Sequence, residues 1–111
     1  MTITTSRRIQ ESPLVIGKNE VIPYTLTFAG FVPAAVTTLT SPTCTLFDIT
    51  AGEPGTDVSA TKLTGSVTFS GLVMTLKLIT GLADGSRYLL RCGGQGGGGT
   101  YELWGEVIGE R

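Results

Sequence analysis

The dipeptide Asp84-Gly85, followed three residues later by Tyr88, constrains the fold of this chain more than any other feature. Asp-Gly is a turn signal, because both residues tolerate the backbone angles of a tight turn. Tyr88, Leu90 and Cys92 then recur with the period of two that a half-buried strand requires. A tyrosine at the start of a strand after such a corner can bind the corner's backbone through its hydroxyl. We therefore expect Asp84, Gly85 and Tyr88 to define the fold of a β-protein.

Short alternating segments separated by turn residues continue along the chain. The predicted strands are 14–16, 21–28, 44–49, 58–63, 66–70, 73–79, 88–92 and 100–108. Strands of this length with a turn about every ten residues are typical of an antiparallel β-sandwich of about seven to eight strands. No window sustains a helical period, so we expect an all-β fold without helices.

The 111 residues suffice for one domain of ordinary size. Residues 1–12 are polar and have no core face, which predicts a flexible N-terminal arm, and 13–111 form a single sandwich domain. The arm lacks the apolar segment of a signal peptide, so we expect cytoplasmic synthesis. In that compartment Cys44 and Cys92 are expected to be free, buried thiols, with a disulfide as the open alternative.

The composition argues against catalysis. The chain has no histidine, the commonest general base and metal ligand. Two cysteines alone make no zinc site. Glu102 and Glu106 are four residues apart on a predicted strand, roughly 13 Å from each other. That separation exceeds the range used by paired carboxylates in glycosidases. We predict no enzyme activity, no catalytic residues, no metal and no cofactor.

A glycine-rich tract lies between the last two predicted strands. It lacks the Gly-Lys-Ser/Thr ending of a phosphate-binding loop, and no helix follows it. We predict a long flexible hairpin tip instead. Its residues are Gly93, Gly94, Gln95, Gly96, Gly97, Gly98 and Gly99.

The last strand carries the strongest candidate for an interaction surface. Tyr101, Leu103 and Val107 occupy one face of it, so Trp104 points outward. An outward tryptophan between glutamates is unusual for an isolated monomer. Phe47 and Ile49 are expected to form a second outward patch. The candidate interface residues are Trp104, Ile108, Glu102, Glu106, Phe47, Ile49, Phe31, Arg7 and Arg8.

Charge restricts the class of partner. The net charge is −1 and basic residues are scattered, which disfavours nucleic acid and membrane surfaces. Charged residues make up only 15% of the chain, against about 25% in typical soluble domains. A surface so poor in charge is weakly protected against association, and this favours a subunit packed against other proteins.

Several segments carry a resemblance to a known family. They are Ile22-Pro23-Tyr24, Cys44-Thr45-Leu46-Phe47-Asp48-Ile49-Thr50, Leu76-Lys77-Leu78-Ile79-Thr80-Gly81-Leu82, Asp84-Gly85-Ser86-Arg87-Tyr88 and the closing strand to Arg111. Together they resemble small immunoglobulin-like virion proteins of tailed bacteriophages. The resemblance implies an immunoglobulin-like sandwich that binds in symmetric copies to portal, neck, tail or fibre proteins, in a virion assembled in the host cytoplasm. We expect an adaptor or neck protein. The alternatives are a capsid decoration protein bound to the major capsid protein, and a carbohydrate- or receptor-binding module.

Overall fold

The computed structural model describes residues 14–17, 20–21, 23–52 and 55–110, and these confirm an all-β fold. Ten strands and one single-turn helix follow one another in the described chain. The strands are β1 Leu14–Gly17, β2 Thr25–Thr27, β3 Thr40–Asp48, β4 Thr56–Asp57, β5 Leu63–Thr64, β6 Thr68–Ser70, β7 Val73–Thr75, β8 Leu78–Ile79, β9 Arg87–Gly96 and β10 Gly99–Glu110, and the helix α1 is Ser59–Lys62. The predicted arm, 1–12, with Arg7 and Arg8, lies outside the described residues.

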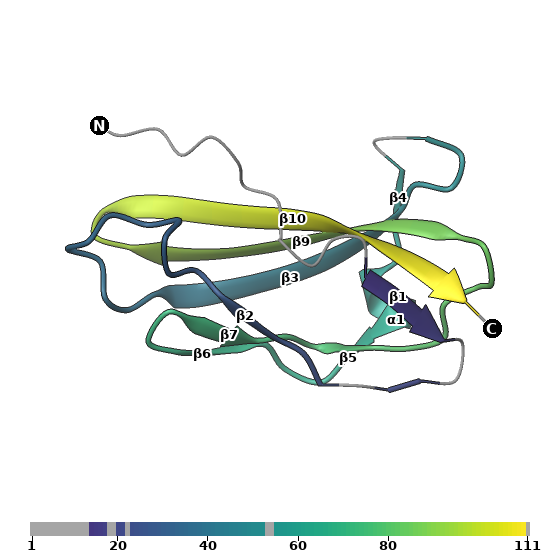
Figure 1. The fold of residues 1–111 in the computed structure, drawn as a ribbon, viewed down its shortest axis with the longest axis horizontal. Coiled ribbons are helices and arrows are strands. Elements are labelled where there is room, and N and C mark those ends of the chain that lie inside the picture. Colours follow the sequence, from purple (N-terminus) through teal and green to yellow (C-terminus); the bar gives the residue numbers. More distant parts are fainter. Residues whose placement is uncertain (1–13, 18–19, 22, 53–54, 111) are drawn as a thin grey trace.

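The largest sheet has the strand order β1-β10-β9-β3-β4. All its pairs are antiparallel except β1 with β10, which run parallel with Leu14 opposite Val107. In Figure 1 the long strands β3, β9 and β10 lie above β2, β6 and β7, so the sheets form layers. Cys44 and Cys92 are register partners on neighbouring strands of the large sheet, so they do not come from facing sheets.

The glycine tract is mostly strand, so the predicted long hairpin tip is wrong. Gly93–Gly96 belong to β9 and Gly99 begins β10. Only Gly97 and Gly98 form the turn, with φ angles of 56° and 81°. Both central residues of a type I′ hairpin turn need such positive values, which glycine adopts without strain.

Close packing explains a further glycine of this tract. A Cβ on Gly94 would lie 2.6 Å from two ring carbons of Phe69. The glycine therefore lets a side chain of the other layer pack directly on the backbone of β9.

The second layer contains a three-stranded sheet, β2-β7-β6, and a separate pair, β5-β8. The predicted strand 73–79 is thus interrupted at Leu76 and Lys77. Beyond the break the alternation shifts, because Ile79 is buried and Leu78 only half-buried. Several strands are short, and the number of strands in the described residues is larger than the predicted seven to eight.

The predicted strand 58–63 is also wrong, because this segment contains α1. The Asp57 carboxylate accepts a hydrogen bond from the Ser59 N–H at 2.9 Å. The Ser59 hydroxyl in turn accepts one from the Leu46 N–H, also at 2.9 Å. Such local side-chain bonds compete with strand pairing and favour turns and helix starts.

A single apolar cluster fills the space between the layers. The predicted inward residues of β9 belong to it, with Tyr88 1% exposed and Leu90 and Cys92 fully buried. Its members are Ile16, Phe28, Val36, Leu39, Cys44, Leu46, Leu63, Met74, Leu76, Ile79, Leu82, Tyr88, Leu90, Cys92, Leu103 and Val107.

The corner before β9 has the hydrogen bonds that its sequence suggests. Gly85 has a φ of 76°, and the Ser86 N–H donates to the Ala83 carbonyl at 3.1 Å. The Tyr88 hydroxyl oxygen accepts a hydrogen bond from the Ala83 N–H at 3.1 Å. The side chain of Tyr88 thereby ties the first inward residue of β9 to the turn that precedes it.

Candidate interaction surface

The outward side chains of the five-stranded sheet form the candidate surface, which we call the outer face. They alternate along each strand with the buried residues of the core. The outer face comprises Val15, Phe47, Arg87, Leu89, Arg91, Glu102, Trp104, Glu106 and Ile108.

Apolar side chains alternate with charged ones across this face. Trp104 is 42% exposed and Val15 is 53% exposed, whereas the other apolar members are half-buried. The register places Val15 beside Ile108 and Phe47 beside Leu89, whereas the partner of Trp104 on β9 is Arg91. Two of the four exposed large hydrophobic residues of the described chain therefore lie on one face.

Each glutamate of the outer face is paired with an arginine of β9. Arg87 Nε and Nη2 donate to the two Glu106 oxygens at 2.9 and 3.2 Å. Arg91 Nε lies 3.4 Å from Glu102 Oε1, and its guanidinium carbon lies 5.2 Å from the centre of the Phe47 ring. These two arginines and two glutamates balance in charge, so the surface presents apolar area among neutralised ion pairs.

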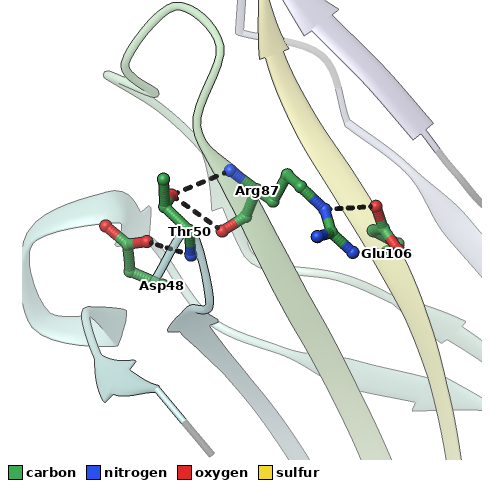
Figure 2. A network of polar contacts seen from close by, with 4 residues as sticks. All are labelled: Asp48, Thr50, Arg87 and Glu106. Atoms are coloured by element: carbon green, nitrogen blue, oxygen red, sulfur yellow. Dashed lines mark hydrogen bonds and ion pairs between the residues drawn. The ribbon is translucent and has the colours of Figure 1, made fainter. Parts of the chain in front are cut away.

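A threonine after β3 holds Arg87 in place (Figure 2). Thr50 Oγ1 accepts from the Arg87 N–H at 3.0 Å and donates to the Arg87 carbonyl at 3.4 Å. The Asp48 carboxylate accepts from the Thr50 N–H at 2.9 Å. The hydrogen bond from the Thr50 N–H lowers the pKa of Asp48. This chain of contacts fixes the end of β3 against the start of β9, where the Arg87–Glu106 pair begins.

Comparison with known protein families, curated proteins and solved structures found no match to this chain.

The described residues contain neither a candidate metal site nor a candidate membrane-spanning helix. Among them, no group of three or more histidine, cysteine, aspartate or glutamate side chains could hold a metal ion. In the same part of the chain, no helix is both long and apolar enough to cross a bilayer.

The structure brings together five of the nine predicted interface residues. Glu102, Trp104, Glu106 and Ile108 of β10 lie on the outer face together with Phe47 of β3.

The prediction that Ile49 points outward to a partner is wrong, because Ile49 is only 5% exposed. Gly55 packs closely against it, since a Cβ on Gly55 would lie 2.9 Å from its Cγ2. Phe31 is also not an outer-face residue, because it is half-buried and packs against the core.

The sequence-based list omitted Val15, Arg87, Leu89 and Arg91. The alternation along β9 indicated three of them, Arg87, Leu89 and Arg91. If Tyr88, Leu90 and Cys92 point inward, their neighbours along the strand must point outward. Val15 was harder to find, since its position depends on which strand β1 joins.

Proposed function

We propose that this protein is a structural subunit that docks through its outer face onto other proteins of an assembly, in symmetric copies and without catalysis. The observation that carries the proposal is the exposure of Trp104, at 42%, on a sheet face that also carries three half-buried apolar side chains. Tryptophan and arginine dominate the energetics of many protein interfaces, and apolar faces of this kind commonly mark docking sites.

The energetics favour repeated weak contacts. Full burial of the exposed part of Trp104 contributes at most about 2–3 kcal/mol per copy. Copies arranged on one symmetric lattice gain strength through effective concentration. The paired arginines and glutamates give the outer face no net charge. Such a face suits a partner surface that is itself close to neutral.

We further propose that the fold is an immunoglobulin-like sandwich. The order β10-β9-β3-β4 fits the larger sheet of such domains, and β2-β7-β6 fits the opposite sheet. The hydrogen bond from the Ala83 N–H to the Tyr88 hydroxyl is the feature typical of their tyrosine corner. One departure is that Cys44 and Cys92 lie in the same sheet, whereas the cysteines of antibody domains bridge two sheets.

The setting we propose is the virion of a tailed bacteriophage, in an adaptor or neck position. This proposal rests on the resemblance of the sequence and on the low charge of the chain, 15%. A charge-poor subunit suits contacts on several sides, whereas a capsid decoration protein needs a well-solvated outer surface.

Labelling of purified particles tests the proposal. Gold-labelled antibodies raised against this chain are applied to tailed-phage particles released by cells that carry its gene. Label at the neck or tail supports the adaptor role, and label over the shell replaces it with decoration. Particles that lack the chain altogether, by labelling and by mass spectrometry, contradict a virion role.

A further inference from the structure

The two cysteines face each other across neighbouring antiparallel strands. Cys44 of β3 and Cys92 of β9 are direct register partners, and their side chains are 4% and 0% exposed. The Ile49 N–H donates to the Arg87 carbonyl, so odd-numbered residues of β9 make the backbone bonds to β3. Cys44 and Cys92 therefore form a non-hydrogen-bonded pair, in which the Cα atoms lie about 4.5 Å apart. Disulfides span Cα separations of roughly 4.4–6.8 Å.

The two thiols perturb each other's ionisation. Cys92 shares a side-chain hydrogen bond with Cys44, and this bond lowers the pKa of the Cys44 thiol to about 7. The same bond, together with burial, raises the pKa of Cys92. The backbone and the charge of Lys77, at the break between β7 and β8, also lower the pKa of Cys44. Cys44 is thus the thiol that ionises first.

We propose that Cys44 and Cys92 form a reversible intramolecular disulfide that locks β3 to β9 when the chain meets a low-molecular-weight disulfide such as oxidised glutathione. This inference rests on the register of the two strands and not on the proposed docking role.

The exchange proceeds in two balanced steps. The Cys44 thiolate attacks one sulfur of oxidised glutathione, forming a mixed disulfide and releasing one glutathione thiolate. The Cys92 thiolate then attacks the Cys44 sulfur and releases the second. The two thiol protons leave on two reduced glutathione molecules. Because both sulfurs are buried, the first step requires local opening of the core, and mild denaturant is expected to accelerate it.

The test uses the full-length chain. Reduced protein is equilibrated with mostly oxidised glutathione in a low concentration of urea, quenched with acid, unfolded and alkylated. We expect a monomer that has lost two hydrogen atoms in intact mass and takes up no alkylating agent. Its Tm is expected to rise by about 10 °C, because the cross-link restricts the unfolded chain. Dithiothreitol is expected to reverse both changes.

The matched controls are Cys44→Ser and Cys92→Ser, which retain one thiol each and are expected to show no gain in Tm. Wild-type protein that remains fully alkylatable overturns the proposal. So does wild-type protein that carries only glutathione adducts or intermolecular disulfides, or an oxidised monomer whose Tm does not rise. These outcomes need only the wild-type chain, so a poorly folding variant does not obscure them.

Discussion

Arg87 and Glu106 form a two-pronged ion pair across β9 and β10, with N–O distances of 2.9 and 3.2 Å. The Glu106 side chain is only 26% exposed, and the backbone of Arg87 is held on its other side by Thr50. The pair therefore links the outer face to the end of β3.

Breaking this pair is expected to have a small, measurable cost. Arg87→Ala is predicted to lower the free energy of unfolding by about 0.5–1 kcal/mol, the upper range for partly exposed ion pairs. A double-mutant cycle with Glu106→Gln isolates the coupling, which urea unfolding measures. Arg87→Lys keeps the charge but loses the fork geometry and should recover only part of the coupling. A coupling energy of zero would show that the pair contributes nothing to stability.

Trp104 is predicted to matter for assembly without being required for folding. Trp104→Ala should leave the fold intact but lower the unfolding free energy by about 2–3 kcal/mol, since more than half of the side chain is already buried in the isolated chain. Each 1.4 kcal/mol of lost contact energy weakens binding about tenfold. Incorporation of the variant into particles, measured by quantitative mass spectrometry, should therefore fall about tenfold or more.

Val73→Ala is the matched control for Trp104, because Val73 is 40% exposed but lies on β7 in the other layer. It should leave incorporation unchanged. Equal incorporation of the Trp104 variant and the wild type would argue against docking through the outer face.

The Tyr88 hydroxyl is predicted to stabilise the corner before β9. Tyr88→Phe preserves the buried ring but leaves the Ala83 N–H without this acceptor. We expect a loss of about 1–3 kcal/mol in the free energy of unfolding. Tyr101→Phe, on half-buried Tyr101 of β10, is the control and should cost less than about 0.5 kcal/mol. Equal costs for the two variants would mean that the corner bond is not the cause.

Gly94 is predicted to be intolerant of a side chain. Gly94→Ala places a methyl group 2.6 Å from the Phe69 ring, and the forced shift should cost about 1–3 kcal/mol. Combination with Phe69→Ala should remove most of that added cost, because the colliding ring is gone. Thermal unfolding of the four proteins in this cycle gives the coupling. Purely additive costs would place the strain elsewhere.

Local patterns in the sequence predicted the features that depend only on residues close to one another along the chain. The alternation along Tyr88, Leu90 and Cys92 gave the buried face of β9, and the same rule put Trp104 outside. The burial of Ile49 had no such signal, because it depends on the close approach of Gly55, which lies outside the strand pattern. The role of Gly94 depends on Phe69 in the opposite layer, which no local pattern contains. The helix α1 escaped detection because two hydrogen bonds of Ser59, rather than a hydrophobic period, stabilise it.

The parallel pairing of β1 with β10 has a mechanical consequence. The strand β1 begins at Leu14 and β10 ends at Glu110. The hydrogen bonds between these two strands lie across the line that joins Leu14 to Glu110. A force that pulls the two ends apart therefore slides one strand along the other and loads all bonds of the pair together. A domain tethered at both ends would resist tension through this short strand pair, before any strain reaches the packed layers.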